Sequence, residues 1–242
     1  MNSFFSLSNV DLNYKITFFE KLIPILLLLF IITILYLTRN KIRNDELLDK
    51  NLRYSFGIIS SIFLSLYYIL EWSTNGITAY NLPLHICFLS NILSIILCFN
   101  KNKKIFNFVV FAGILGGISS LLAPELNLSF KHFRYYQFMI CHISIIVIPI
   151  YFIFVYKYTV SIKDTLKVIF TIEALGICLG IFNEIYGSNY MFVSFTSNHA
   201  AKNSILYFIG QGYYYFLNLQ FLFIVIILFW YLILKSSFKY LN

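Results

Sequence analysis

Cys87 and His142 are the residues of this sequence whose types and spacing could do covalent chemistry, and they lie in two separate apolar segments. Imidazole is the usual base that turns a thiol into a reactive thiolate at neutral pH. Measured from the predicted outer ends of their segments, at ~1.5 Å of rise per residue, Cys87 lies about 7 Å deep and His142 about 9 Å deep. If the two side chains meet, the chemistry is acyl transfer through a thioester.

Each of the two residues also has an ordinary structural interpretation. A single cysteine in a membrane helix usually acts as a small hydrophobic residue, and an unassisted buried thiol is inert. A single histidine within the membrane more often bridges helices by hydrogen bonds than takes part in chemistry. The sequence alone does not decide between these interpretations, because it cannot show that two helices touch.

Further polar residues are predicted at the same level as the pair. Cys87, Asn91 and Ser94 follow the spacing i, i+4, i+7, so they share one helix face, which we expect to turn toward the bundle interior. Amide or phenol groups near the thiol could stabilise an oxyanion. The candidates for substrate binding or orientation are His85, Asn91, Glu71, Asn189 and Tyr190.

The composition predicts the class of protein that must position these residues. The chain of 242 residues is 60% hydrophobic and only 12% charged, which is typical of a polytopic membrane protein. We predict an all-α membrane helix bundle that forms a single integral membrane domain over residues 1–242. The seven predicted spans are 19–38, 54–73, 82–99, 105–122, 136–156, 166–183 and 213–234. Pro83 would lie in the first turn of the third span, and Gly113 with Gly116-Gly117 would form a small-residue packing face on the fourth.

The distribution of basic residues predicts the orientation of the bundle. The net charge of +8 comes from basic residues in short loops between apolar runs, which argues against a nucleic-acid partner. Thirteen of the 18 Lys and Arg residues fall on one predicted face: 39, 41, 43, 50, 53, 101, 103, 104, 157, 163, 167, 235 and 239. The other five are at 15, 21, 131, 134 and 202. We therefore expect the N-terminus outside and the C-terminus in the cytoplasm.

Four segments give the sequence a family resemblance. They are Asn81-Leu-Pro-Leu-His-Ile-Cys87, Gly116-Gly117 with Leu122-Ala-Pro124-Glu-Leu126, Gln137-Phe-Met-Ile-Cys-His142 and Gly187-Ser-Asn-Tyr-Met191. From about residue 50 to its end, the chain resembles the transmembrane protein 164 family and, within it, the bacterial YwaF-like branch. The resemblance implies an integral membrane acyltransferase that acts on phospholipid acyl chains. It also implies that Cys87 is the nucleophile and His142 its partner.

Two positions depart from the pattern of the family. Bacterial relatives often carry an acidic residue after the cysteine, whereas this chain has Phe88. Before the last helix the family usually has a Gly-Pro-Trp-Pro-Trp-Tyr-like stretch, and this chain reads Gly210-Gln-Gly-Tyr-Tyr-Tyr215. These departures bear on recognition of the acceptor or head group more than on the chemistry.

The resulting hypothesis is an acyltransferase of the bacterial cell membrane that moves a fatty acyl chain between membrane phospholipids and needs no cofactor. Hydrolysis is the nearest variant. A second hypothesis is a solute transporter or channel whose path is lined by Cys87, Asn91 and Ser94. A third is a metal or haem site built from His85, Cys87, His142 and Glu71. The four cysteines (Cys87, Cys98, Cys141 and Cys178) lie in apolar segments without CxxC spacing, so we expect no disulfide framework or zinc ribbon.

Overall fold

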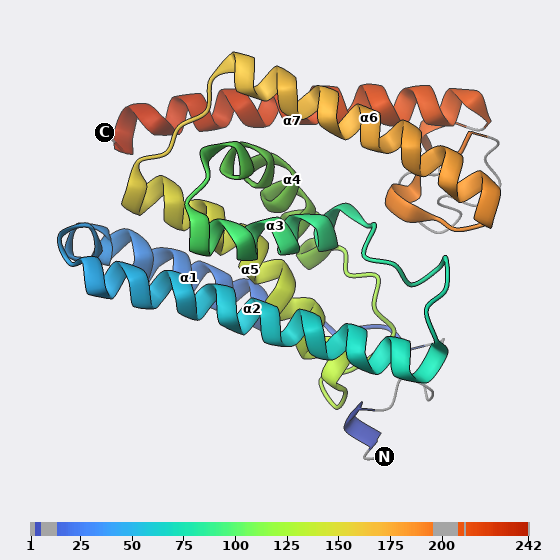
Figure 1. The fold of residues 1–242 in the computed structure, drawn as a ribbon, viewed down its shortest axis with the longest axis horizontal. Coiled ribbons are helices and arrows are strands. Elements are labelled where there is room, and N and C mark those ends of the chain that lie inside the picture. Colours follow the sequence, from blue (N-terminus) through green and yellow to red (C-terminus); the bar gives the residue numbers. More distant parts are fainter. Residues whose placement is uncertain (1–2, 6–13, 196–207, 211, 242) are drawn as a thin grey trace. The chain divides into compact units, whose positions relative to one another are not determined.

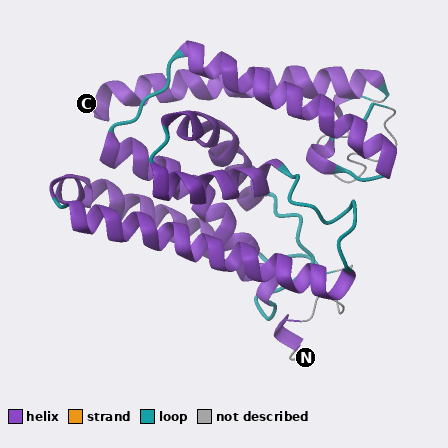
Figure 2. Ribbon diagram, viewed as in Figure 1, coloured by secondary structure: helices purple, strands orange, loops and turns teal. Residues whose placement is uncertain are grey.

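The computed structural model describes residues 3–5, 14–195, 208–210 and 212–241, and these residues form helices and loops without a strand (Figures 1 and 2). The predicted all-α class is therefore confirmed for the described part of the chain. Its helices are η1 (Ser3–Phe5), α1 (Phe18–Asn44), α2 (Glu46–Asn75), α3 (Ile86–Asn100), α4 (Lys103–Leu122), α5 (Phe133–Tyr156), α6 (Ile162–Tyr186), η2 (Tyr190–Phe192) and α7 (Tyr213–Leu241).

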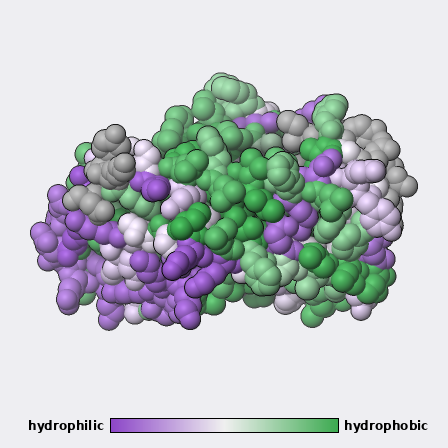
Figure 3. Space-filling model, turned by 90° about the horizontal axis from the view of Figure 1, so that it is seen from above, coloured by the Kyte–Doolittle hydropathy of each residue, from purple (hydrophilic) through white to green (hydrophobic). Residues whose placement is uncertain are grey.

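Six of these helices are long and apolar enough to cross a membrane, which supports a multi-pass membrane protein. The exception among the α-helices is α3, whose 15 residues are apolar but fall short of the roughly 20 that a span needs. On the face drawn in Figure 3, a broad area of hydrophobic side chains lies beside areas of hydrophilic ones.

The helices fall into two compact units, each described here by itself. Unit 1 comprises residues 1–76 and 87–158 and so contains α1, α2, α4, α5 and all of α3 except its first residue, Ile86. Unit 2 comprises residues 77–86 and 159–242, which include α6, η2 and α7.

Hydrogen bonds at the two ends of unit 1 fix the direction of its helices. At one end, the guanidinium of Arg43 on α1 donates to the carbonyl of Phe154 on α5, with Nε 2.9 Å from the oxygen. Arg53 of α2 likewise donates to the carbonyl of Cys98 on α3. At the opposite end, the phenol of Tyr135 donates to the carbonyl of Glu20 at 2.7 Å. Successive helices of the unit therefore run in alternating directions.

Glu20 ties the N-terminal end of α1, at what the predicted orientation makes the outer end of unit 1, to the loop before α5. Its buried carboxylate accepts hydrogen bonds from the phenol of Tyr14 at 2.7 Å and from the backbone N–H of Phe130 at 3.0 Å. It also closes a capping box with Thr17, which satisfies the first N–H groups of the helix. Burial, with the adjacent Glu20 carboxylate, raises the pKa of Tyr14 to about 12, so the phenol remains a donor at neutral pH.

Close packing of α4 on α5 forms the core of unit 1. A Cβ added at Gly117 would lie 2.5 Å from the side chain of Ile146, and one at Gly113 would lie 2.8 Å from the carbonyl of Ile145. Pro149 has no N–H to donate to that same carbonyl, so Gly113 brings α4 against a backbone oxygen that the helix leaves unpaired. The predicted small-residue packing face is confirmed at these two glycines.

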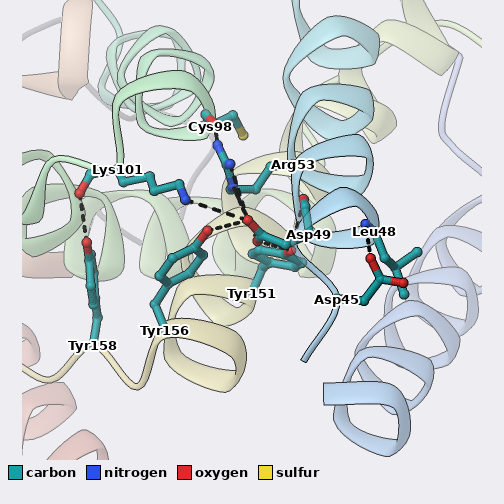
Figure 4. A network of polar contacts seen from close by, with 9 residues as sticks. All are labelled: Asp45, Leu48, Asp49, Arg53, Cys98, Lys101, Tyr151, Tyr156 and Tyr158. Atoms are coloured by element: carbon teal, nitrogen blue, oxygen red, sulfur yellow. Dashed lines mark hydrogen bonds and ion pairs between the residues drawn. The ribbon is translucent and has the colours of Figure 1, made fainter. Parts of the chain in front are cut away.

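A buried ionic network joins α2, α3 and α5 at the end of unit 1 where Arg43 meets Phe154, called the inner end after the predicted orientation (Figure 4). Asp49 is its centre, and the phenol of Tyr151 donates to its carboxylate at 2.6 Å. Tyr156 donates a second hydrogen bond, and Arg53 binds the carboxylate with Nη2 at 3.2 Å. The ammonium of Lys101 lies 3.6 Å from the same carboxylate. Buried charges are tolerated when they are paired and hydrogen-bonded in this way.

Unit 2 is organised around Asn183 and Tyr190. The side chain of Asn183 accepts a hydrogen bond from the backbone N–H of Tyr190 at 2.9 Å and donates to the carbonyls of Tyr190 and Val193. Glycine 176 of α6 lets the side chain of Gln220 on α7 approach closely, since an added Cβ would lie 2.9 Å from the amide. Asn183 therefore fixes the described start of the long segment after α6, of which residues 196–207 lie outside the described residues.

Several predicted helix boundaries are wrong. α1 and α2 extend through the stretch predicted as a basic loop, and Asp45 alone separates them because it caps α2 through the N–H of Leu48. α3 begins at Ile86 rather than at residue 82, so Pro83 lies in a loop and not in a first helical turn. The reason is a tertiary contact. The phenol of Tyr190 accepts a hydrogen bond from the N–H of Leu82 and donates one to the carbonyl of Ala79, both at 2.8 Å.

Candidate active site

Cys87 lies in the first turn of α3, with its side chain facing α4. The residue is half-buried, and its Sγ lies 3.7 Å from the hydroxyl oxygen of Ser120. All four cysteines carry free thiols. The hydroxyl of Ser120 can donate to a thiolate, so this contact supplies a hydrogen bond that would stabilise the charged form.

His142 lies in the middle of α5 and is only 9% exposed. Its Nδ1 is 2.7 Å from the carbonyl oxygen of Phe138, one turn earlier in the helix. A carbonyl oxygen can only accept, so Nδ1 must carry the proton in this contact. The lone pair of the neutral ring is then on Nε2, which is the arrangement that a general base requires.

Two sets of contacts bring Cys87 and His142 to similar depths in unit 1. On α3, the amide of Asn91 donates to the carbonyl of Cys141 at 3.2 Å, so the residue before His142 is level with a position one turn beyond Cys87. On α4, Gly117 faces the carbonyl of His142 and Ser120 contacts the thiol. At ~1.5 Å of rise per residue, the first route separates the pair by five residues, or about 7.5 Å in depth, and the second by three residues, or about 4.5 Å.

The pair does not share a hydrogen bond in the structure. Within the described residues, the side-chain partner of Cys87 is Ser120, and that of the His142 ring is the Phe138 carbonyl. Depths counted from the helix ends also change, because α3 starts at Ile86 and α5 at Phe133. Cys87 is then about 1.5 Å and His142 about 13.5 Å from the start of its helix. The similar depth follows from the packing of the helices, and not from the ends of the apolar runs.

Asn91 holds the helices of the site together. The residue is only 1% exposed. Its Oδ1 accepts a hydrogen bond from the hydroxyl of Ser60 on α2 at 3.0 Å, and its Nδ2 donates one to the carbonyl of Cys141 on α5. Ser94 is also fully buried, so the predicted inward face of α3 is confirmed for both residues. Because both ends of its amide are occupied within the protein, Asn91 is suited to positioning α5 rather than to binding a substrate.

The remaining predicted site residues divide between the two units. Glu71 lies near the end of α2 in unit 1, where its carboxylate accepts from the amide of Asn75 at 2.8 Å. His85, Asn189 and Tyr190 belong to unit 2. The ring of His85 packs edge-on against Tyr190, with centroids 5.0 Å apart, and Asn189 precedes the short helix η2. Tyr190 is buried and holds the loop that leads into α3.

Sequence reasoning missed Ser120 and the aromatic surroundings of the pair. Ser120 follows the Gly116-Gly117 segment by one turn, and that glycine signal marks the face of α4 that approaches α5. Phe88, the residue after the thiol, stacks on Tyr67 of α2 with centroids 5.7 Å apart and planes 7° apart. The ring of Phe138 lies 4.1 Å from that of His142. Two of these contacts join helices that the sequence could not pair.

The third hypothesis, a metal site, finds no support in the geometry. In the part of the chain that the structure describes, no three His, Cys, Asp or Glu side chains lie close enough to hold a metal ion together. The residues around the thiol and the imidazole are instead aromatic, amide and hydroxyl groups. Such surroundings suit an apolar substrate with a polar reacting group.

The comparisons with known proteins give one result. A family model described as the TMEM164 family matches residues 12–231, which is most of the chain. No curated protein and no solved structure matches the chain.

Proposed function

The chain belongs to the TMEM164 family, and we propose that it is an integral membrane acyltransferase that moves a fatty acyl chain between membrane phospholipids. Cys87 is the nucleophile in this proposal and His142 the general base. The enzyme needs no cofactor for this reaction, and it belongs to the bacterial YwaF-like branch of the family and acts in the bacterial cell membrane.

The observation that carries the proposal is the tautomer of His142. The Phe138 carbonyl fixes the ring proton on Nδ1, which leaves the lone pair of Nε2 available to take a proton, and the thiol lies within about one and a half helical turns of the ring in depth. A purely structural histidine would be expected to bridge two helices with its side chain, whereas the Nδ1 bond of His142 stays within α5. Ser120 adds a donor beside the sulfur.

The reaction consists of two balanced steps. Nε2 of His142 takes the thiol proton, and the thiolate of Cys87 attacks the ester carbonyl carbon of a phospholipid. The ester C–O bond breaks, and the lysophospholipid oxygen leaves with the proton from the imidazolium. In the second step, the hydroxyl of an acceptor lipid gives its proton to Nε2 and attacks the thioester. The C–S bond breaks, the new ester forms, and the proton returns to the sulfur. Water in place of the acceptor gives the hydrolytic variant.

The first step of the proposed reaction requires a movement of the Cys87 side chain. The thiol hydrogen-bonds Ser120 before the reaction, and the Cys87 side chain has to turn toward His142 to lose its proton. A thiol in the first turn of a helix is well placed for this, since α3 has no helical turn before it to restrict the side chain. Catalytic hydrogen bonds are often long in the free enzyme and tighten only with substrate bound.

The topology that goes with this function has seven crossings, with the N-terminus outside and the C-terminus in the cytoplasm. In this proposal α3 counts as a short crossing helix. Two observations support it: α3 runs antiparallel to α2, and the Arg53–Cys98 bond brings its C-terminal end level with the second turn of α2. The site then lies in the outer half of the membrane.

The transporter alternative lacks a comparable observation. The predicted polar path used Cys87, Asn91 and Ser94, and of these Asn91 has both ends of its amide bound to protein groups. A solute path would need polar groups that are available to the solute.

A transfer assay tests the proposed function. Protein in liposomes is given a phospholipid with a labelled acyl chain and an unlabelled lysophospholipid acceptor. We expect the wild-type protein to move the label and Cys87→Ala to reduce transfer to background. Cys178→Ala, which removes an exposed thiol on α6, is the matched control and should be unaffected. Transfer by the Cys87→Ala protein would refute the thioester route, and label recovered only as free fatty acid would assign hydrolysis instead.

A further inference from the structure

Arg134 is a preorganised cation beside the candidate site in unit 1. It lies in the first turn of α5, and its guanidinium carbon is 4.3 Å from the centroid of the Tyr67 ring and 5.7 Å from that of Phe138. Its Nη1 also donates to the side chain of Gln137. Stacking on an aromatic face and one hydrogen bond fix the plane of the guanidinium.

Within the described residues, the guanidinium of Arg134 uses only a small part of its hydrogen-bonding capacity. A guanidinium carries five N–H donors, and the hydrogen bond to Gln137 uses one of them. The two ion pairs in the described parts of the chain both involve Asp49, so neither neutralises Arg134. The nearby carboxylate of Glu71 is bonded to Asn75. A fixed guanidinium with free donors and no acidic partner is a binding site for an anion that accepts two hydrogen bonds.

The cation is connected to both candidate catalytic residues through aromatic rings. Arg134, Phe138 and His142 follow the spacing i, i+4, i+8, so they share one face of α5. The ring of Phe138 lies between the guanidinium and the imidazole and contacts both. On the other side, Tyr67 stacks under the guanidinium and against Phe88, the neighbour of Cys87. An anion held by Arg134 would therefore lie beside the same group of aromatic side chains as the thiol and the imidazole.

The depth of Arg134 suits a lipid phosphate. It is at the membrane-surface end of α5, and His142 is eight residues, or about 12 Å of helical rise, further in. Lipid head groups occupy roughly the outer 5–7 Å on each side of a hydrocarbon core about 30 Å thick. The long arginine side chain can place its charge within this layer. In a glycerophospholipid, the ester groups lie just inside the phosphate, toward the level of His142.

We propose that Arg134 binds the phosphate diester of the phospholipid substrate and so places an ester carbonyl at Cys87 and His142. This assignment rests on the proposed function and adds the feature of the substrate that is recognised. The general alternative, a basic residue placed to set topology, fits Arg134 poorly. In the proposed orientation this residue is on the outer side, whereas the positive-inside rule concerns basic residues on the cytoplasmic side.

Substrate discrimination tests the assignment. The donors are a phosphatidylglycerol and a galactosyl diacylglycerol with identical acyl chains, assayed with wild type, Arg134→Gln, Arg134→Lys and the control Lys131→Gln, which changes an exposed cation near the same helix end. We expect Arg134→Gln to raise KM for the phospholipid roughly 10- to 100-fold, the loss typical of charge-assisted hydrogen bonds, with a smaller change in kcat. The galactolipid should be used equally by all variants. Arg134→Lys should recover part of the loss.

Three results would overturn the assignment. These are equal losses on both donors, unchanged kinetics in Arg134→Gln, and competition by inorganic phosphate, which would indicate a site for the free ion instead of the lipid. Thermal unfolding of each variant separates loss of binding from loss of folding.

A binding measurement without turnover separates this proposal from the proposed function. Phospholipid and galactolipid binding is measured by native mass spectrometry on Cys87→Ala protein, with and without Arg134→Gln. Selective loss of the phospholipid in the double variant supports the phosphate site even if no acyl transfer is found. Equal retention of both lipids refutes it even if transfer is found.

Discussion

Two polar clusters of unit 1, the Asp49 network at its inner end and the candidate site nearer its outer end, use their residues in opposite ways. At the inner end, Asp49 is bonded by Tyr151, Tyr156 and Arg53, and Lys101 completes its surroundings. At the outer end, the thiol of Cys87 has one weak partner, and His142 uses one of its two ring nitrogens. The groups of the inner network bind one another. The thiol and the imidazole, in contrast, retain hydrogen-bonding positions that these contacts do not use.

This difference separates structure from function in a chain where polar residues are few. A buried network whose members are all satisfied rigidifies the fold, and it offers nothing to a ligand. Groups with spare donors or lone pairs in an aromatic setting can bind and react with one. We expect substitutions in the Asp49 network to reduce stability, and those at Cys87 and His142 to reduce activity.

The largest expected effect comes from opening the inner network. Asp49→Ala removes the centre and leaves the buried guanidinium of Arg53, only 4% exposed, without its counter-ion. The free energy of unfolding should fall by about 3–5 kcal/mol, the usual cost of breaking a buried pair. Denaturant unfolding in detergent measures it. The control is Glu46→Ala, an exposed acid one turn earlier, with less than about 0.5 kcal/mol expected. Similar losses in both variants would contradict the closed-network account.

Replacing the proposed base, His142, should reduce activity and leave stability almost unchanged. His142→Gln keeps a donor for the Phe138 carbonyl but has no imidazole to take a proton. The acyl-transfer rate should fall roughly 10²- to 10⁴-fold, the contribution typical of a general base, while stability changes little. Transfer kinetics and thermal unfolding are measured on the same sample. His132→Gln, at the start of the same helix, should retain full activity. Activity within twofold of wild type in His142→Gln would exclude this histidine as the base.

The smallest of these effects should be a mixed one, from the helix contact that joins the two regions. Gly117→Ala adds a Cβ that would meet Ile146 and the carbonyl of His142. Overpacking of this kind costs about 1–3 kcal/mol, and the shift of α5 should also lower the transfer rate. Ser119→Ala, on the exposed face of α4, is the control. An increase in stability for Gly117→Ala would show that α4 and α5 are not in close contact.

Much of the fold could be predicted from the sequence because long apolar runs must form helices in a bilayer. The runs mark the α-helices, but they locate only the apolar part of each. The polar ends of α1 and α2, which meet at Asp45, were missed because a change in hydropathy marks the membrane boundary and not the end of a helix. The start of α3 was misplaced because the side chain of Tyr190, 108 residues from Leu82, holds the preceding loop open.

The site could be predicted in part. The residue types of Cys87 and His142 identify a chemistry, and their similar depth in unit 1 is consistent with it. The depth could not be derived from helix ends, since it depends on the Asn91–Cys141 bond and on the Gly117 contact. Arg134 was counted only as a charge in a loop, although it starts α5 on the face of His142. No periodicity in the sequence reveals that Tyr67, on another helix, stacks beneath it.

The central claim is that Cys87 carries the acyl group, and trapping the intermediate tests it most directly. Protein incubated with a phospholipid donor and no acceptor is quenched in acid and analysed by intact mass and peptide mapping. The account predicts an added mass of one acyl chain on the peptide with Cys87, removed by neutral hydroxylamine as thioesters are, absent in Cys87→Ala and retained in Cys178→Ala. Label on another residue, or transfer that proceeds without a covalent intermediate, would contradict it.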